Sequence, residues 1–297
     1  MLINEERWRW LLDDRATRPD RVFELAANRR RRPLLGEDGR LVIIAADHAA
    51  RRILGVGDDR WAMADRRRLL ERIIVALRRP GVDGLLATPD IFEDLLRLGE
   101  LDGHLVFGSM NRGGLTGSSW ELDDRFTAFD APTIAAMGLD GGKMLLRIDD
   151  TDPGSNQTMV ACAGAVGALA AERLVAMVEP LPARRDPDGR VRVVNDPDLL
   201  VEAVAVASAL GPVSAYTWLK LPAPAEPERV LAATSLPCLL LGGDPGERSE
   251  ELMASWEAAM ALPQVRGLVA GRSLLYPPDG DVAAVVDRAV AVVRGKK

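Results

Sequence analysis

The chain has 297 residues, of which 47% are hydrophobic and 28% are charged, so it can bury a large core. Its formal net charge of −6 argues against a nucleic acid or an anionic membrane as the main partner. The N-terminal stretch MLINEERWRW is too charged for a signal peptide, and no apolar run approaches the ~20 residues of a membrane span. We therefore expect a soluble, cytoplasmic protein. The two cysteines, Cys162 and Cys238, lie far apart in apolar stretches and are expected to be buried, reduced thiols.

Short aliphatic runs that end in polar residues or glycine alternate with amphipathic stretches along the chain. Eight runs are predicted to be strands: 41–48, 82–88, 104–110, 141–149, 173–180, 213–220, 237–244 and 265–272. The clearest predicted helices are 65–79, 197–210, 247–262 and 280–294. Parallel strands need crossover connections, so this alternation favours a parallel sheet, and eight βα units favour a closed (β/α)8 TIM barrel.

A single barrel domain over residues 1–297 is expected, because α/β barrels of this length routinely form one domain. Residues 1–40 precede the first strand and are predicted to form an N-terminal helical segment that caps the barrel floor. The arginine run NRRRRP in this segment is most simply a solvated face. Such barrels often assemble through their outer helices, so we expect a homo-oligomer, with Trp8, Trp10 and Trp256 as candidates for buried contacts.

Polar residues gather at the carboxyl ends of the predicted strands, the end that carries the active site in TIM-barrel enzymes. Asp47 and His48 end the first strand, Glu179 ends the fifth and Lys220 ends the sixth. The other polar or glycine strand ends are Ser109 to Arg112, Arg147, Asp149 and Asp150, Gly242 and Gly243, and Gly271 and Arg272. This placement predicts one site at the barrel mouth.

Two lysines carry the chemical hypothesis. Lys143 lies within the fourth strand and Lys220 ends the apolar run YTWLKLP, although a buried ammonium group is costly. Alternate strands share a layer of the barrel interior, so the two ammonium groups are expected to face each other and, with burial, to lower one another's pKa. A neutral amine forms a Schiff base with a carbonyl substrate, and Asp47 and Glu179 would move protons during carbinolamine formation and carbon–carbon cleavage.

Each of these residues also has a simpler interpretation. Lys143 and Glu179 could form a purely structural ion pair, and Lys220 could be a solvated strand end. Asp47 and His48 could cap the helix that follows.

Side-chain alternation raises a difficulty for the sixth strand. A regular strand that points Lys220 inward also points Tyr216 and Trp218 inward, which would crowd the barrel interior unless a bulge intervenes.

The glycines that end the last two strands predict a phosphate site. Gly242 and Gly243 end the seventh strand, and Gly271 and Arg272 end the eighth. Backbone N–H groups in such loops, with a helix N-terminus behind them, bind phosphate, and TIM barrels often place phosphate after strands 7 and 8. Arg272 would add a charge-assisted contact. Glycine also ends strands for conformational reasons alone.

In order and strand assignment, these motifs resemble class I, Schiff-base aldolases of the tagatose-bisphosphate and archaeal fructose-bisphosphate aldolase group. More narrowly, they resemble an actinobacterial (β/α)8 aldolase-like branch that is often associated with inositol catabolism. In this family a strand-6 lysine, matched by Lys220, forms the Schiff base, and a strand-4 lysine, matched by Lys143, assists. The strand-1 aspartate and the strand-5 glutamate are matched by Asp47 and Glu179.

The chain departs from this family in ways that concern the substrate. Strand 4 ends RIDDTD, where tagatose-bisphosphate enzymes have aromatic residues, and Arg147 shares side-chain parity with Lys143. Arg147 is therefore predicted to reach a second anionic group, and His48 is a further candidate for substrate binding. The glycine-rich loop 111–120 suits a mobile lid. The inositol association would imply 2-deoxy-5-keto-gluconate 6-phosphate, cleaved to dihydroxyacetone phosphate and malonate semialdehyde.

Two other functions stay open. A zinc-dependent lyase usually needs several histidines, whereas this chain has two, and His104 precedes its strand at the opposite end from His48, so zinc is not expected. Magnesium held by Asp47, Glu179 and Asp149 would suit a metal-dependent barrel lyase. A barrel that binds a sugar phosphate without turning it over is the second alternative, because fold alone does not establish activity. We expect a small-molecule sugar phosphate as ligand, with no metal and no cofactor.

Overall fold

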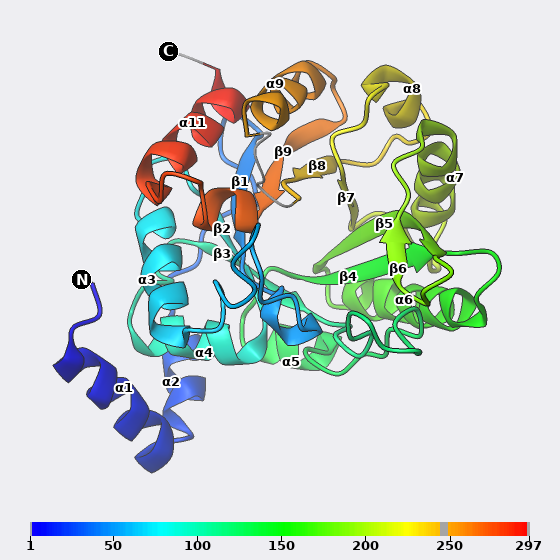
Figure 1. Cartoon of the computed structure of the whole chain (residues 1–297). Helices are drawn as coiled ribbons and strands as arrows, with labels where there is room; N and C mark the ends of the chain where they lie inside the picture. The colour runs from blue at the N-terminus through cyan, green and yellow to red at the C-terminus, as the bar shows by residue number, and fades with distance from the viewer. Residues whose placement is uncertain (1, 244–248, 296–297) are drawn as a thin grey trace.

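Eight aliphatic strands pair in parallel and close on themselves in a computed structural model that describes residues 2–243 and 249–295 (Figure 1). The sheet order is β4-β3-β2-β1-β9-β8-β7-β5, and β4 pairs with β5 to complete the barrel. This is the predicted (β/α)8 TIM barrel. The eight barrel strands are β1 (Leu41–Ala45), β2 (Gly84–Ala87), β3 (Leu105–Ser109), β4 (Gly141–Ile148), β5 (Val175–Arg185), β7 (Thr217–Leu221), β8 (Cys238–Leu241) and β9 (Val265–Ala270).

Helices surround the barrel and follow local signals in the sequence. Five of them have proline in the first turn, where its missing N–H costs nothing, and several begin at an aspartate that accepts hydrogen bonds from the first turn. The helices are α1 (Glu5–Thr17), α2 (Arg21–Asn28), α3 (Arg66–Leu77), α4 (Pro89–Arg97), α5 (Ala131–Ala136), α6 (Pro153–Ala171), α7 (Pro197–Ser208), α8 (Pro227–Leu231), α9 (Ser249–Met260), α10 (Arg272–Leu275) and α11 (Val282–Arg294), with a short 3-10 turn at Ala49–Arg51. The ends of two predicted elements, at 244 and at 247–248, fall outside the described residues.

The barrel interior accommodates an inward Trp218 without a bulge in its strand. β7 begins at Thr217 rather than at 213, so Tyr216 lies outside it. The strand pairs in unbroken register with β5 and with β8, and Trp218 belongs to the buried cluster inside the barrel, which also holds Phe107 and Met177. The expected crowding is therefore relieved by the late start of the strand. The register shift in this part of the sheet lies between β8 and β9.

One strand continues well past its predicted end. β5 runs to Arg185 and turns back through a loop in which Gly189 has a φ of 79°, a conformation that favours glycine. The returning strand β6 (Val191–Val193) pairs antiparallel with the end of β5 and makes a hairpin above the barrel (Figure 1). The turn motif DPDG at residues 186–189 was the sequence signal from which this hairpin could have been predicted.

The N-terminal segment forms two helices that lie against α4, while the residues after them contact the barrel floor. Arg29 is buried and donates to the carbonyl oxygens of His104 and Gly138, which precede β3 and β4. Arg32 pairs with Asp83 at 2.6 Å. The arginine run was expected to be solvated. This expectation is wrong for Arg29, which is buried, and Arg32 is only partly exposed, because both side chains bind acceptors near the strand starts.

One predicted subunit contact is corrected by its burial. Trp256 in α9 has no exposed surface, and its Nε1 donates to the carbonyl oxygen of Leu241 at 3.1 Å. It therefore belongs to the core and does not reach a partner. Trp8 and Trp10 are partly buried against the same core. Within residues 2–243 and 249–295, no helix is long and apolar enough to cross a bilayer.

Replacement of Arg29 tests the contacts at the barrel floor. Arg29→Met leaves two buried carbonyl oxygens without their charged donor, and we expect the free energy of unfolding to fall by about 2–4 kcal/mol. The exposed neighbour Arg30, changed to Met, is the matched control and should stay within about 0.5 kcal/mol of wild type. Urea denaturation measures both. Equal effects of the two substitutions would contradict a structural role for Arg29.

Candidate active site

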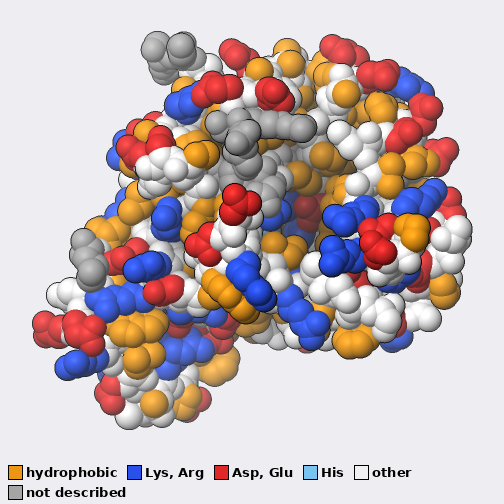
Figure 2. Space-filling view, viewed as in Figure 1, with side chains coloured by type: hydrophobic (Ala, Val, Ile, Leu, Met, Phe, Trp, Pro, Cys, Tyr) orange, Lys and Arg blue, Asp and Glu red, His pale blue; other side chains and the backbone are white. Residues whose placement is uncertain are grey.

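All ten residues proposed from the sequence line one cavity of about 400 Å³ at the carboxyl ends of the strands. Figure 2 shows this face of the molecule hollowed, with cationic side chains around the hollow. The cavity therefore lies at the end of the barrel that carries active sites in this fold. The ten residues are Asp47, His48, Lys143, Arg147, Glu179, Lys220, Gly242, Gly243, Gly271 and Arg272.

A carboxylate bridges two ammonium groups at the centre of the cavity. Lys220 Nζ lies 2.9 Å from Glu179 Oε1, and Lys143 Nζ contacts the other oxygen, Oε2. The sheet explains this arrangement, because β5 lies between β4 and β7, and its register pairs Val178 with Leu219, one residue before each charged side chain. All three groups are buried.

Lysine is rare enough in this chain for the placement to be informative. The sequence holds four lysines, and two of them are the last two residues, Lys296 and Lys297. The other two, Lys143 and Lys220, both lie in this cavity. Arginine is far more abundant and meets the structural demand for cations elsewhere. A purely structural ion pair has no evident need for lysine here, whereas a reactive amine does.

Burial and the bridging carboxylate set the protonation of these groups. Burial alone would raise the pKa of Glu179, but the ammonium groups of Lys143 and Lys220 lower it to about 2, so the carboxylate stays ionised. Burial lowers the pKa of Lys143 to about 8, and the carboxylates of Asp47 and Glu179 keep it from falling further. Lys143 is therefore an amine that can give and take a proton near neutral pH.

Asp47 is held by residues that the sequence placed at a strand end without assigning them to the site. Ser109 Oγ donates to Asp47 Oδ2 at 2.9 Å, and Arg112 Nη2 lies 3.0 Å from the same oxygen. Arg112 Nη1 also donates to the Asp47 backbone oxygen at 2.8 Å. Burial alone would raise the pKa of Asp47, but Arg112 and Lys143 hold it well below its usual range. The layer shared by alternate strands was the signal that could have linked β1 with β3.

Asp47 also approaches the central pair. Its Oδ2 lies 3.5 Å from Lys143 Nζ, so Lys143 contacts two carboxylates, whereas Lys220 pairs with Glu179 alone among the described residues. Lys143 is therefore the more constrained of the two amines, and Lys220 has more freedom to approach a ligand.

The glycine loops bring backbone close to the cavity on the side of β8 and β9. A Cβ on Gly271 would lie 2.4 Å from both the Ala45 carbonyl oxygen and His48 Cε1, so the position requires glycine. A Cβ on Gly242 would lie 2.1 Å from Ser273 Oγ. The helix behind Gly271 is the single turn α10, and the loop after Gly243 continues into residues outside the described part of the chain.

His48 lies between these loops and Asp47. Burial lowers its pKa to about 3, so the imidazole is neutral at physiological pH. A neutral imidazole can donate one hydrogen bond and accept another, and it adds no charge to the cavity.

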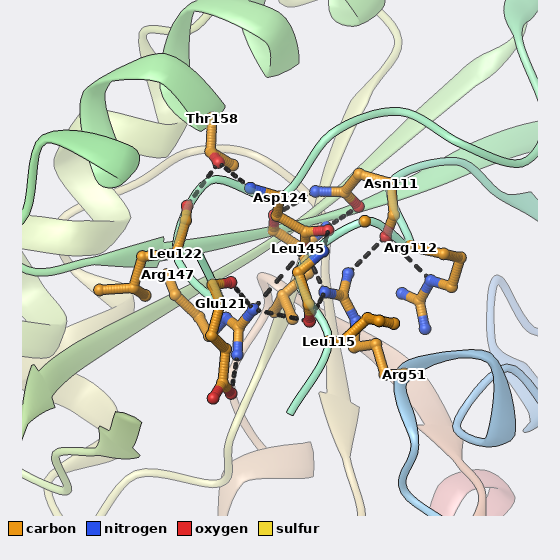
Figure 3. A network of polar contacts seen from close by, with 12 residues as sticks. Arg51, Asn111, Arg112, Leu115, Glu121, Leu122, Asp124, Leu145, Arg147 and Thr158 are labelled. Atoms are coloured by element: carbon orange, nitrogen blue, oxygen red, sulfur yellow. Dashed lines mark hydrogen bonds and ion pairs between the residues drawn. The ribbon is translucent and has the colours of Figure 1, made fainter. Parts of the chain in front are cut away.

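Arg147 faces the cavity but is engaged by the loop that follows β3. Its Nη1 donates to Glu121 Oε1 at 2.5 Å, and its Nη2 donates to the backbone oxygen of Glu121 (Figure 3). A contact with a second anionic group, as predicted, would compete with Glu121 for this guanidinium.

The same loop is fastened to the barrel at further points. The side-chain amide of Asn111 exchanges two hydrogen bonds with the backbone of Leu145 in β4, at 2.6 and 2.8 Å. Arg51 pairs with Asp124 and donates to the Gly114 carbonyl oxygen (Figure 3). Opening residues 111–120 as a lid would break buried ion pairs and hydrogen bonds.

The carboxylates of the cavity do not assemble into the magnesium site that the sequence left open. Asp149 accepts hydrogen bonds from Thr151 and from the Arg185 backbone and does not line the cavity. Lys143 stands between Asp47 and Glu179 and contacts both. Within residues 2–243 and 249–295, no three histidine, cysteine or acidic side chains are grouped so as to hold a metal ion.

Comparison with known proteins assigns the chain to a family. A family model described as Cgl0159-like matches residues 39–290, which include every residue of the site. This chain belongs to the Cgl0159-like family. It is similar to the solved structure of Cgl0159 from Corynebacterium glutamicum, with 50% identity, a TM-score of 0.95, and coverage of 98% of this chain and 97% of that one. No curated protein matches it in sequence.

More distant similarity extends to fructose-bisphosphate aldolases. An archaeal fructose 1,6-bisphosphate aldolase aligns with a TM-score of 0.65 at 16% identity, over 93% of this chain and 100% of that one. A Schiff base-forming fructose-1,6-bisphosphate aldolase aligns with a TM-score of 0.64 at 17% identity, over 92% and 99%. At this level of identity the Cgl0159-like protein shares their barrel fold.

The protonation of Lys143 in this Cgl0159-like protein can be measured directly. After reductive ¹³C-methylation, we expect the Lys143 signal to titrate with a midpoint near pH 8, because burial destabilises the ammonium form. The neutral fraction should grow as the pH rises through that value. Loss of the signal in Lys143→Arg assigns it, and the two C-terminal lysines serve as internal references. A midpoint near the ordinary value of 10.5 would contradict the described burial.

Proposed function

We propose that this protein is a class I aldolase, a carbon–carbon lyase that cleaves a phosphorylated ketose or keto-sugar acid through a Schiff base on Lys220. The observation that carries the proposal is the pair of buried lysines bridged by Glu179 at the mouth of a TIM barrel. Two lysines in one layer, beside glycine loops at the ends of β8 and β9, are what a carbonyl-attacking amine and an adjacent phosphate site require.

The first half of the reaction forms the Schiff base. After losing a proton, the amine of Lys220 adds to the substrate ketone and gives a carbinolamine. Lys143, whose pKa is lowered by burial to about 8, donates a proton to the carbinolamine oxygen, which leaves as water. The resulting iminium ion is cationic, and Glu179, 2.9 Å from Lys220 Nζ, is its counter-ion.

The second half breaks the carbon–carbon bond. Lys143, now neutral, accepts the proton of the substrate hydroxyl, and the electron pair of the breaking bond moves into the iminium to give an enamine while an aldehyde departs. Protonation of the enamine carbon and hydrolysis of the iminium release the ketone product and restore Lys220. Asp47 positions Lys143 throughout, because its carboxylate is fixed by Ser109 and Arg112.

The charge of the cavity supports an anionic substrate. Six cationic and three anionic side chains line it, although the whole chain has a net charge of −6. Such a local excess of positive charge attracts anions and concentrates them at the site. The cationic residues are Arg51, Arg112, Lys143, Arg147, Lys220 and Arg272, and the anionic ones are Asp47, Glu121 and Glu179.

Within this class, we propose a substrate phosphate at the loops of Gly242, Gly243, Gly271 and Arg272, with His48 as an uncharged hydrogen-bonding partner. The family resemblance of the sequence motifs suggests 2-deoxy-5-keto-gluconate 6-phosphate as the specific substrate. Arg147 is the candidate contact for its acidic end, if Glu121 yields the guanidinium.

Borohydride trapping tests the proposal. Incubation with dihydroxyacetone phosphate and sodium borohydride should give a stable adduct that peptide mapping places on Lys220, and Lys220→Arg should abolish it. Lys143→Arg should still form the adduct but should lose about 10²- to 10⁴-fold in retro-aldol turnover, because its proton transfers are lost. The small number of lysines makes the mapping unambiguous.

Other results would identify the alternatives. An adduct on Lys143 alone would reverse the two roles. Absence of an adduct, together with activity that a chelator removes, would support a metal-dependent lyase. Binding of dihydroxyacetone phosphate without any adduct or cleavage would support a barrel that binds sugar phosphates without turning them over.

A further inference from the structure

The hairpin of β5 and β6 extends the interior face of the barrel above its mouth. Side chains alternate along a strand, so Leu181 and Ala183 share the face of Glu179. The register pairs Ala183 with Val193 and Arg185 with Val191, which puts both valines on this same face. Leu181, Val191 and Val193 all line the cavity, and we refer to these three residues as the hairpin wall.

The hairpin that carries the wall is fixed in place by the polar contacts of Arg185. Arg185 donates to Asp152 at 2.9 Å and to the Gly189 carbonyl oxygen at 2.7 Å, and its backbone N–H donates to Asp149 at 3.0 Å. These bonds tie the hairpin to the start of α6 and close its own turn. The wall is therefore a built surface of the cavity.

The wall is an apolar part of a cavity whose lining also includes nine charged side chains. Val193 is 53% exposed, and Leu181 and Val191 are partly exposed, although all three lie in strands. None of these side chains can donate or accept a hydrogen bond. A ligand hydroxyl placed against them would lose its water without gaining a partner, whereas a methylene or methyl group would gain apolar contact.

The order of the strands decides which part of a substrate meets the wall. Lys220 is the penultimate residue of β7, and the proposed phosphate loops follow β8 and β9 on one side of it. The wall belongs to β5 and β6, on the other side. A ketone that reacts with Lys220 and places its phosphate at the glycine loops therefore directs the rest of its chain toward the wall.

We propose that the hairpin wall selects the aldehyde half of the substrate, favouring one with no hydroxyl on the carbon next to its carbonyl group. This inference rests on the proposed aldolase function and narrows its substrate class to deoxy compounds, which release an aldehyde without that hydroxyl group. Leu181, Val191 and Val193 are its specificity-determining residues.

Aldol addition of dihydroxyacetone phosphate tests this selection with two aldehydes of similar size, propanal and glycolaldehyde. The measured quantity is the ratio of kcat/KM for propanal to that for glycolaldehyde, each corrected for the free aldehyde. We expect the wild type to favour propanal by about tenfold, from one apolar contact and one unpaired hydroxyl. Val191→Thr/Val193→Thr, which keeps the shape and adds hydroxyl groups, should bring the ratio at least about fivefold closer to unity.

Controls separate this inference from the function on which it rests. Val160→Thr, at an exposed position of α6 outside the cavity, should leave the ratio unchanged. The double variant should still form the borohydride adduct with dihydroxyacetone phosphate, because the wall does not touch the nucleophile. Val191→Ala/Val193→Ala, a second variant, should weaken propanal alone.

The outcomes are distinguishable. A wild type that adds both aldehydes with no preference, or a double variant whose ratio is unchanged while its adduct forms, overturns the role of the wall and leaves the aldolase function standing. A wild type that gives neither an adduct nor an addition product overturns both proposals.

Discussion

The carboxylate of Glu179, shared between Lys143 and Lys220, is the interaction on which the rest of the site depends. Two ammonium groups buried in one layer of a barrel would repel each other and would lack water, and either effect alone would destabilise the fold. One carboxylate between them contacts both ammonium groups, and Asp47 adds a second negative charge beside Lys143. Removing the Glu179 carboxylate would leave uncompensated buried charge, which typically costs about 3–5 kcal/mol. The barrel supplies this geometry, because β5 lies between the two strands that carry the lysines.

The cavity around Lys143, Glu179 and Lys220 has sides of different chemical character. The end of β3 and the loop after it hold two charged residues of the cavity. Ser109 and Arg112 bind Asp47, and Glu121 binds Arg147. The ends of β8 and β9 present backbone at positions where only glycine fits. The extension of β5 presents an apolar wall. A single barrel mouth thus combines two buried lysines, two carboxylates, a glycine-lined edge and an apolar face.

Much of this arrangement could be predicted from the sequence, for identifiable reasons. The spacing of apolar residues, and the glycine and polar residues that end each apolar run, located eight strands. The active sites of TIM barrels lie at the carboxyl ends of the strands, and this rule placed Asp47, Glu179 and the two lysines in one site. The rarity of lysine supported the prediction of the site, because this chain uses arginine elsewhere and places its two internal lysines in the cavity. The family resemblance was based on the order of the motifs along the chain, because each motif alone is short.

Other features could not be predicted, because they depend on tertiary contacts. The contacts of Ser109 and Arg112 with Asp47 could be predicted only by knowing that the ends of β1 and β3 lie at the same height in the barrel. The pairing of Arg147 with Glu121 joins residues 26 positions apart through an irregular loop. The solvated interpretation of NRRRRP failed for Arg29 because the carbonyl groups it meets come from distant strand starts. The hairpin wall was missed because β5 continues to Arg185, beyond the aliphatic run that predicted the strand.

Exchange of the ketone oxygen with solvent is the most direct test of an amine that attacks a carbonyl group beside Glu179. Schiff-base formation expels the ketone oxygen as water, and hydrolysis returns a solvent oxygen, so dihydroxyacetone phosphate labelled with ¹⁸O at its carbonyl group should lose the label at a rate proportional to protein concentration. Lys220→Arg should abolish the catalysed exchange, and Glu179→Gln should slow it by about 10²-fold or more. Exchange at the uncatalysed rate with the wild type, or full exchange with Lys220→Arg, would contradict the mechanism.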